Sequence, residues 1–287
     1  MELLFSKMHG CGNDYIVLDG RDLNINWSNI ASVYCERNFS VGADGLLVVE
    51  TSDIAPIKMS MYNPDGSQAQ MCGNGIRCFT KFIIENSIVN LDNNELSIET
   101  LSGVLSVFPE IDSIGLVSTV RVSMGVPIFS PKNLPVSPSL SEFSQLDDYK
   151  IVVDNHDIYI SCVSMGNPHA VAFLENDVDD FPLDRIGPIV ENLDIFPERI
   201  NFHIVNVIDE AHIKARSWER GAGLTLACGT GACAVQVISK KKGYTNNNID
   251  LSMPGGNLKM NWEGVGQSVF MEGPAKFVFN GHLSIDE

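Results

Sequence analysis

The chain has little positive charge. It contains 19 Lys and Arg residues against 36 Asp and Glu residues, which gives a formal net charge of −17 over 287 residues. A nucleic-acid-binding surface needs clustered Lys and Arg to neutralise phosphates, so we expect no nucleic-acid partner. The negative charge says little about the substrate, because whole-protein charge acts mainly on solubility.

Long apolar runs and paired cysteines are lacking as well. No stretch reaches the roughly 18 apolar residues of a membrane-spanning helix, so we expect no membrane span. The first residues, MELLFSKMHGCGND, do not resemble a signal peptide. The seven cysteines are an odd number and none lies in a Cys-x-x-Cys pair. This composition favours free thiols in a cytoplasmic protein over a disulfide framework, and it predicts no metal site.

The most informative feature is an internal repeat. KMSMYNPDGSQAQMCGNG at 58–75 aligns without a gap with KARSWERGAGLTLACGTG at 214–231, which places Cys72 over Cys228. Two copies with one thiol each predict a single site near a pseudo-twofold axis, flanked by two equivalent thiols. Inversion of a stereocentre needs two such acid/base groups on opposite sides of one atom.

The repeat extends on both sides of the cysteines. GNDYIVLD, which starts at Gly12, recurs as GNPHAVAF, which starts at Gly166, and Gly103-Val104-Leu105 recurs more loosely as Gly256-Asn257-Leu258. A period this long indicates duplicated domains and not a solenoid of short repeats.

Short apolar and alternating runs dominate the chain and predict strands. The expected strands are Leu46–Val49, Ile57–Met61, Ser97–Thr100, Gly103–Phe108, Val117–Val122, Ile158–Val163, Ala170–Leu174, Phe202–Val207, His212–Ser217, Ile249–Met253 and Val269–Met271. The expected helices are 74–86, 230–242 and 28–37, the first two directly after the repeated cysteines. Residues 131–148, rich in Pro, Ser and acidic residues, are expected to form an exposed excursion.

This pattern predicts an α/β (α+β) protein of two pseudo-symmetric domains. Each is expected to be a curved, mostly antiparallel sheet around one central helix.

A cysteine at a helix start lies next to unpaired N–H groups and a partial positive charge. These stabilise a thiolate, so the pKa of Cys72 and of Cys228 can fall below the usual value of about 8.5. The glycine after each cysteine lets a ligand approach the backbone, and the same N–H groups can bind a carboxylate.

The two copies differ where Asn63-Pro64 in the first aligns with Glu219-Arg220 in the second. An adjacent Glu and Arg can bind an ammonium and a carboxylate, and they can equally form a solvated ion pair. Three asparagines and a histidine also lie in or beside turns, where they serve as turn or core residues as readily as ligands: Asn13, Asn167, Asn201 and His169.

The motifs together resemble the diaminopimelate epimerase family. The resemblance is carried by KMHGCGNDYIVLD, MYNPDGSQAQMCGNGIRCF, SMGNPHAV, FPERINF and WERGAGLTLACGTGACA, and it runs from residue 5 to about 275. It implies the two-domain epimerase fold, in which each domain is a barrel-like sheet around a central helix and the end of the chain returns to the first domain. On this basis we place the first domain at 1–119, with 273–287 returning to it, and the second at 120–272. The resemblance further implies a cofactor-independent interconversion of LL- and meso-diaminopimelate, in lysine and peptidoglycan precursor synthesis. The expected partner is this small molecule. A homodimer is possible, although the sequence does not give the oligomeric state.

The resemblance also implies roles for particular residues. Cys72 and Cys228 are the two acid/base thiols, and His169 and Glu219 assist catalysis. Some members carry a substrate-contacting Gln where this chain has Gly45. The implied substrate-binding residues are Asn13, Asn63, Gly73, Asn74, Asn167, Asn201, Glu219, Arg220, Gly229 and Thr230.

Other functions fit part of the pattern. A related two-thiol racemase acting on proline or hydroxyproline shares the cysteines, but Glu219-Arg220 favours a substrate with a second charged end. A redox or metal-binding protein is disfavoured by the cysteine spacing. A non-catalytic binding module is expected to lack one of the thiols, and both are present.

Overall fold

The computed structural model describes residues 1–91, 94–143 and 145–285. The chain divides into two compact units, Met1–Ser123 with Glu272–Glu287, and Met124–Met271. The boundary expected at residue 119 falls inside strand β8 (Val117–Ser123). Residues 286–287 of the expected returning segment lie outside the described residues. The assignment of the units as two epimerase domains stays a prediction.

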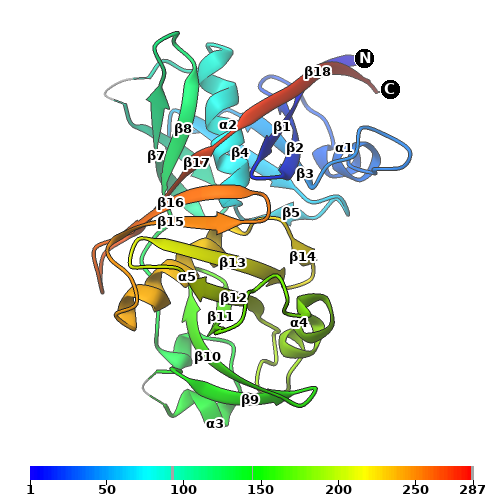
Figure 1. The fold of residues 1–287 in the computed structure, drawn as a ribbon. Coiled ribbons are helices and arrows are strands. Elements are labelled where there is room, and N and C mark those ends of the chain that lie inside the picture. Colours follow the sequence, from blue (N-terminus) through cyan, green and yellow to red (C-terminus); the bar gives the residue numbers. More distant parts are fainter. Residues whose placement is uncertain (92–93, 144, 286–287) are drawn as a thin grey trace. The chain divides into compact units, whose positions relative to one another are not determined.

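The first unit is a sheet that surrounds helix α2 (Gly73–Glu85), which contacts β1, β2, β3, β7 and β8 (Figure 1). Its strands and remaining helix are β1 (Glu2–Gly10), β2 (Asn13–Asp19), α1 (Trp27–Tyr34), β3 (Gly45–Glu50), β4 (Ile57–Tyr62), β5 (Gln68–Ala69), β6 (Leu96–Thr100), β7 (Gly103–Ile111), β8 and β18 (Lys276–Ser284). β2 pairs with β3 and β4 with β6 in parallel, whereas β18–β1, β1–β2, β3–β4, β4–β5, β6–β7 and β7–β8 are antiparallel.

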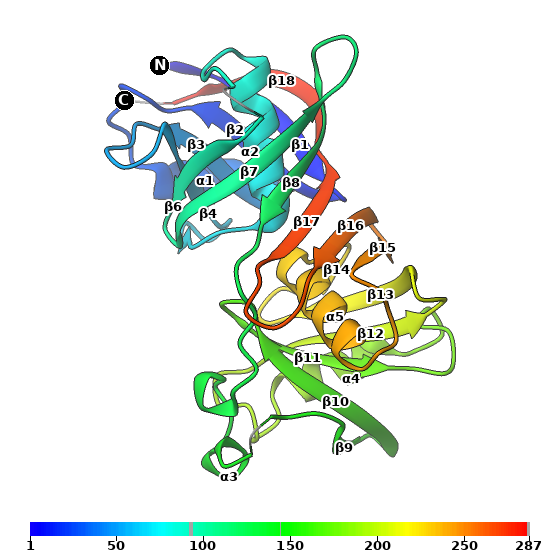
Figure 2. The same cartoon turned by 90° about the vertical axis from the view of Figure 1, so that its left-hand side faces the viewer.

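The second unit repeats this order around helix α5 (Gly229–Lys241), as Figure 2 shows. Its other elements are η1 (Pro131–Asn133), α3 (Pro138–Ser141), β9 (Tyr149–Val153), β10 (His156–Ser164), β11 (Pro168–Phe173), α4 (Leu183–Glu191), β12 (Asn201–Val207), β13 (His212–Glu219), β14 (Gly223–Thr225), β15 (Asn248–Met253) and β16 (Gly256–Trp262), and β17 (Val269–Pro274) leads back to the first unit. β11–β12 and β13–β15 are parallel, and β9–β10, β10–β11, β12–β13, β13–β14 and β15–β16 are antiparallel. The expected mostly antiparallel sheet around a central helix is therefore confirmed for each unit.

Burial on both faces explains why β3 reads as a continuous apolar run. Leu46 and Val48 belong to a core cluster with Trp27 and Ile30 of α1, and the alternate residue Leu47 comes close to Gly75 of α2. A strand covered on both faces loses the polar half of its alternation. The same two-layer burial recurs in β12, where Phe202 and Ile204 join the core cluster that includes α4.

The two central helices begin one residue before their expected starts and end one residue before their expected ends. Each is buried over nearly its whole circumference near the N-terminus. In α2 the apolar side chains of Ile76, Phe79 and Ile83 are fully buried, and the burial of each stabilises the fold by about 1.5–3 kcal/mol. The helices are thus fixed by the surrounding strands, and their first residues are held in place by the core.

Two expectations about the second unit were wrong. Residues 131–148, of which residue 144 lies outside the described residues, are not simply exposed, because Leu134, Leu140 and Leu146 are buried in the core cluster. Helix α4 was not expected, since Gly187 and Pro188 interrupt its pattern. Pro188 lies inside α4 and has no backbone N–H to donate to the helical hydrogen-bond ladder. Packing of the buried Ile186 and Val190 retains the helix nevertheless.

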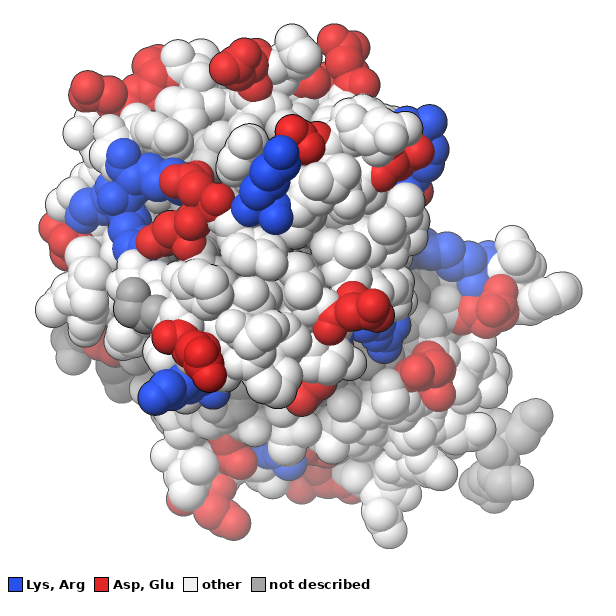
Figure 3. All heavy atoms as spheres, turned by 90° about the horizontal axis from the view of Figure 1, so that it is seen from below, with Lys and Arg blue, Asp and Glu red and all other residues white. Residues whose placement is uncertain are grey.

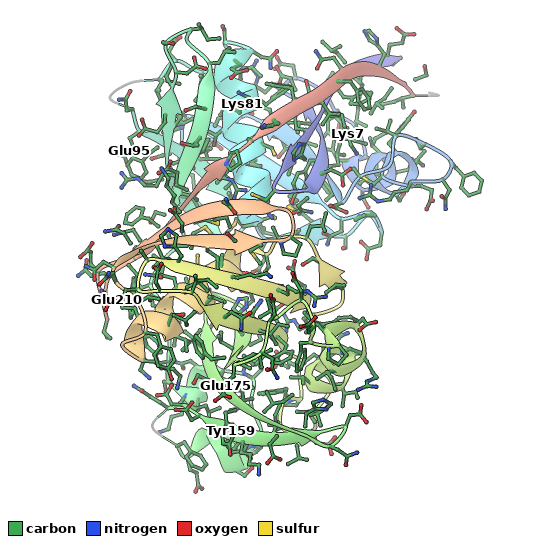
Figure 4. The ribbon with its side chains drawn as sticks, viewed as in Figure 1. Lys7, Lys81, Glu95, Tyr159, Glu175 and Glu210 are labelled. Carbon is green, nitrogen blue, oxygen red and sulfur yellow. The ribbon has the colours of Figure 1, made fainter. Side chains whose placement is uncertain are left out.

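Charged side chains form local ion pairs. Figure 3 shows Lys and Arg of the described residues beside Asp and Glu on the face drawn there. Two lysines labelled in Figure 4 are nearly buried in the first unit: Lys7 on β1 pairs with Asp14 at 2.6 Å, and Lys81 on α2 pairs with Glu85 at 2.6 Å. Across residues 1–91, 94–143 and 145–285, no helix combines the length and the apolar character needed to cross a membrane.

Candidate functional site

Cys72 is the N-cap of α2 and is partly exposed. Its sulfur lies 2.9 Å from the hydroxyl of Tyr15 and 3.5 Å from Oδ1 of Asn13. Nδ2 of Asn74 is 3.4 Å from the same oxygen. We call this group, Asn13, Tyr15, Cys72 and Asn74, the first thiol centre.

The orientation of Asn13 is set by a carboxylate. Nδ2 of Asn13 donates to Oδ2 of Asp44 at 2.6 Å, so Oδ1 must face the thiol, where the Tyr15 hydroxyl also donates to it. Burial, followed by the nearby Cys72, raises the pKa of Tyr15 well above its usual value. Tyr15 therefore stays protonated. Its hydroxyl donates a hydrogen bond to Asn13 and could donate instead to a Cys72 thiolate.

A buried arginine holds the start of α2. Arg77 is 0% exposed, and its guanidinium donates to the carbonyl of Gly73 at 3.1 Å and to Oδ1 of Asn74 at 2.9 Å. A third bond reaches the carbonyl of Pro274 at 3.2 Å. Arg77 thereby fixes the two residues whose backbone amides are expected to bind a carboxylate. Sequence reasoning missed it, although it lies inside the GIRCF motif.

Cys228 is the N-cap of α5 and is 3% exposed. Its sulfur accepts from the backbone N–H of Gly231 at 3.3 Å and lies 3.7 Å from Oγ1 of Thr230. Glu219, at the end of β13, also hydrogen bonds with the thiol and accepts from Oγ1 of Thr225 at 2.6 Å. We call the group around this sulfur the second thiol centre. Its members are Cys228, Thr230, Glu219, Asn167 and His169.

The expected low pKa is wrong for Cys228. Burial raises its pKa well above the usual value, and the Glu219 carboxylate raises it further, both as a charge and as a hydrogen-bond acceptor. The Gly231 N–H and the Thr230 hydroxyl act in the opposite direction but are outweighed. In this structure Cys228 is thus held as a thiol that points its proton toward a carboxylate.

His169 lies at the same position of the repeat as Tyr15. Its Nε2 is 2.8 Å from Oδ1 of Asn167, and Nδ2 of Asn167 donates to Oγ1 of Thr230 at 3.3 Å. In the first unit Tyr15 likewise bonds the asparagine two residues earlier, but there Asn74, the equivalent of Thr230, donates to the asparagine oxygen. His203 also contacts His169.

The remaining predicted asparagines lie at strand ends: Asn63 follows β4 and Asn201 begins β12. Asn63 is held in its turn by Nδ2 donating to Ser67 Oγ at 3.0 Å. Asn201 is 4% exposed, and its amide donates to the carbonyl of Pro168 at 2.8 Å and accepts from the backbone N–H of Arg220 at 3.0 Å. Asn201 therefore braces the turn that carries Glu219 and Arg220.

A glutamate that sequence reasoning missed supports this turn. Glu191, at the end of α4, is 5% exposed and accepts from Nε1 of Trp218 at 2.7 Å and from the backbone N–H of Gly221 at 3.0 Å. Arg220 itself donates from Nη1 to the carbonyl of Glu198 at 3.0 Å. The WERG motif is thus anchored on both sides of Glu219.

Gly45 pairs with Tyr15 across β2 and β3. A Cβ at this position would lie 2.9 Å from the carbonyl oxygen of Tyr62. A glutamine here would require the backbone to shift, so any contact that other members make through that side chain must come from another residue in this chain.

The other thiols are structural. None of the seven cysteines forms a disulfide, and burial raises the pKa of Cys35, Cys78 and Cys162 to about 12. Such thiols stay protonated and unreactive at neutral pH. Within the described part of the chain, no group of three or more His, Cys, Asp or Glu residues is placed to hold a metal ion.

Two matched halves, each with a thiol at the start of its central helix, define an isomerase of the kind that inverts an amino-acid stereocentre. The comparisons with known proteins name the family. A model of diaminopimelate epimerase matches residues 5–129 and 161–278. The diaminopimelate epimerases of Methanococcus maripaludis, Acetivibrio thermocellus and Halothermothrix orenii are 44%, 42% and 42% identical, over 98–100% of this chain and 99–100% of theirs. The chain belongs to the diaminopimelate epimerase family.

Solved structures support the fold. A hydroxyproline epimerase from Agrobacterium vitis superposes with a TM-score of 0.71 at 13% identity, covering 100% of this chain and 93% of the other. A phenazine biosynthesis protein of the PhzF family from Bacillus anthracis gives 0.72 at 17% identity, covering 99% and 100%. At such identities the likeness concerns the fold alone.

Proposed function

We propose that this chain epimerises LL-diaminopimelate to meso-diaminopimelate in lysine biosynthesis by a two-base mechanism in which Cys72 and Cys228 are the acid/base pair. The observation that carries the mechanism is the difference between the two thiol environments. The Cys72 sulfur lies 2.9 Å from the Tyr15 hydroxyl, which can donate to a thiolate. Cys228 faces the carboxylate of Glu219, which suits a thiol.

One thiolate and one thiol are what a single turnover needs. The thiolate removes the α-proton from one face of the amino acid, and the thiol delivers its proton to the opposite face. After turnover the protonation states are exchanged, and the reverse reaction uses them in the exchanged roles. Glu219, which hydrogen bonds with the Cys228 thiol and favours its protonated form, and His169 are assigned to assist this proton transfer.

The α-proton of an amino acid is only weakly acidic, so the developing negative charge must be stabilised. We assign this role to the backbone amides of Gly73–Asn74 and Gly229–Thr230 at the two helix starts, which can bind the α-carboxylate. At the start of α2 the Cys72 side chain makes no capping hydrogen bond, and its sulfur contacts Tyr15 and Asn13 instead. No cofactor is part of this proposal.

Four asparagine side chains complete the proposed binding site. Asn13, Asn63, Asn167 and Asn201 are assigned to the substrate's polar groups, with Asn201 acting through the turn that it braces. Glu219 and Arg220 offer a carboxylate and a guanidinium for a substrate that carries an ammonium and a carboxylate at each end.

Two further assignments concern the location and the oligomeric state of the protein. Free thiols are typical of a reducing compartment, which supports a cytoplasmic location. A homodimer stays a prediction, and light scattering on the purified protein would test it.

The function is tested by incubating the protein with LL-diaminopimelate in deuterated water. We expect loss of the α-proton signal and appearance of the meso isomer, with no added cofactor. Cys72→Ala and Cys228→Ala should each abolish epimerisation, whereas Cys35→Ala and Cys162→Ala, which remove buried thiols outside the two centres, serve as matched controls.

Clear activity of either Cys72→Ala or Cys228→Ala would overturn the two-base mechanism. Turnover of proline or hydroxyproline with none of diaminopimelate would overturn the substrate assignment instead.

A further inference from the structure

A second buried histidine stands behind His169. His203 on β12 is 0% exposed, and its Nε2 lies 2.9 Å from Nδ1 of His169. Its Nδ1 lies 2.8 Å from the hydroxyl of Ser217 on β13, which is also 0% exposed. The three residues occupy adjacent strands and continue the chain of hydrogen bonds from Asn167 into the interior.

Both histidines are neutral. Burial lowers the pKa of His203 to about 3, and burial together with the neighbouring His203 and Arg220 lowers the pKa of His169 well below its usual value. A neutral imidazole has one nitrogen that donates and one that accepts. The donor and the acceptor of each hydrogen bond between Asn167 and Ser217 therefore follow from the groups at the two ends of this series.

The direction can be read from Asn167. Its Nδ2 donates to Thr230, so its Oδ1 faces His169 and can only accept; Nε2 of His169 must carry the proton. Nδ1 of His169 then accepts, so Nε2 of His203 must donate. Nδ1 of His203 is left to accept, and the Ser217 hydroxyl supplies that proton.

The first unit provides an internal comparison. Leu47 and Met61 occupy the positions equivalent to His203 and Ser217, and each pair is a direct cross-strand pair in its own sheet. Leu47 is 0% and Met61 7% exposed, so the same backbone accepts an apolar pair there. Two polar side chains at this depth are costly unless fully hydrogen bonded, which suggests that they serve His169 and not the core.

The glycine of the second CGTG motif accommodates His203. A Cβ on Gly231 would lie 2.3 Å from Cε1 of His203, so the ring packs directly against the first turn of α5. The ring is therefore held by packing on one side and by two hydrogen bonds in its plane.

We infer that His203 and Ser217 are positioning residues that hold His169 in the tautomer protonated at Nε2. The consequence lies at Asn167. Because its oxygen is occupied by His169, its amide protons are directed toward Thr230 and toward ligands. Resting on the proposed function, this predicts that Asn167 binds an acceptor group of diaminopimelate, such as a carboxylate oxygen, and not an ammonium.

The tautomers can be measured directly. In ¹⁵N-labelled full-length protein at neutral pH, long-range ¹H–¹⁵N correlation spectra distinguish a protonated Nε2 from a protonated Nδ1. We expect both His169 and His203 to be neutral and protonated at Nε2. Signals are assigned with His203→Leu, His203→Gln, Ser217→Ala and, as a control on an exposed histidine of the same unit, His212→Gln.

The variants should separate positioning from mere packing. His203→Leu, which installs the residue that the first unit carries, should leave His169 as a mixture of tautomers and raise KM for diaminopimelate about tenfold, the value of one hydrogen bond to a charged group. His203→Gln keeps a donor near Nε2 and should restore the tautomer and most of the affinity. Ser217→Ala should leave His203 as a mixture of the two neutral tautomers, with little change in packing.

A wild-type His169 protonated at Nδ1 would overturn the inference, as would an Nε2 tautomer that persists in both His203→Leu and Ser217→Ala. If the tautomers behave as expected while the protein does not epimerise diaminopimelate, the positioning role stands and the proposed function fails.

Discussion

Replacing Tyr15 by phenylalanine removes a single hydroxyl from the first thiol centre. Asn13 Oδ1 keeps Asn74 and Cys72 as neighbours, at 3.4 Å and 3.5 Å, so the fold should lose no more than about 1 kcal/mol. In the proposed mechanism, a thiolate at Cys72 would lose the hydroxyl that lies 2.9 Å from its sulfur. A hydrogen bond to a charged group is worth about 1.5–3 kcal/mol, which corresponds to about 1–2 pH units in the ionisation of the thiol.

The assay is the pH dependence of Cys72 alkylation by iodoacetamide, followed by peptide mass spectrometry. The O–H donor favours the charged form, so its removal should move the midpoint upward by about 1–2 pH units and slow epimerisation at neutral pH by about 10- to 100-fold. Tyr34→Phe, which removes a phenol bonded to the Ser284 carbonyl in the same unit, is the matched control. A midpoint that stays in place in a folded Tyr15→Phe protein would refute the donor role.

Three other changes have defined outcomes. Burial would raise the pKa of Asp14, but hydrogen bonds from Arg37 and other neighbours outweigh it and hold the pKa at about 2. The unfolded pKa is about 3.9, so the ionised carboxylate stabilises the fold at pH values above about 3.9. This stabilisation is lost as the pH falls through about 2. Asp14→Asn should therefore cost about 2 kcal/mol in urea unfolding at pH 7 and progressively less between pH 5 and pH 3, and a constant deficit would contradict this. Gly231→Ala should destabilise by about 1–3 kcal/mol through its clash with His203, and combining it with His203→Ala should give less than the sum of the two losses, whereas additive losses would argue against the contact. Arg220→Lys keeps the charge but loses the planar fork, so KM for diaminopimelate should rise with a smaller loss in kcat, and an unchanged KM would place Arg220 outside the binding site.

The sequence allows the two central helices to be predicted almost to the residue because their signals are local. The CGxG motif and the helical spacing of Ile76, Phe79 and Ile83 lie within a dozen residues. The strands buried on both faces, such as β3, are equally visible as apolar runs. Helix α4 was missed because Gly187 and Pro188 are locally unfavourable, and the packing that overrides them comes from distant strands.

The residues around the thiols were only partly predictable. The cysteines, asparagines and Glu219-Arg220 stand out because they lie in repeated or asymmetric motifs. His203 and Ser217 do not, since they are 14 residues apart and meet only through the register of β12 and β13. The electrostatics of Cys228 also could not be inferred, because a helix start alone predicts a lowered pKa and the opposing effects, burial and Glu219, appear only in three dimensions.

The duplicated fold shows how one architecture can provide two different thiol environments. At the equivalent positions Tyr15 and His169, each half bonds an asparagine oxygen two residues earlier, so the backbone and the asparagine are shared. Divergence lies in what surrounds this shared unit: the phenol reaches the sulfur of Cys72 directly, whereas Cys228 is given a carboxylate acceptor and its histidine is backed by a second histidine. If both halves had kept one environment, both thiols would favour the same protonation state, and the proposed reaction, which uses one thiolate and one thiol, would begin from a minor population. The asymmetry of the two centres is therefore what the proposed mechanism requires of a symmetric scaffold.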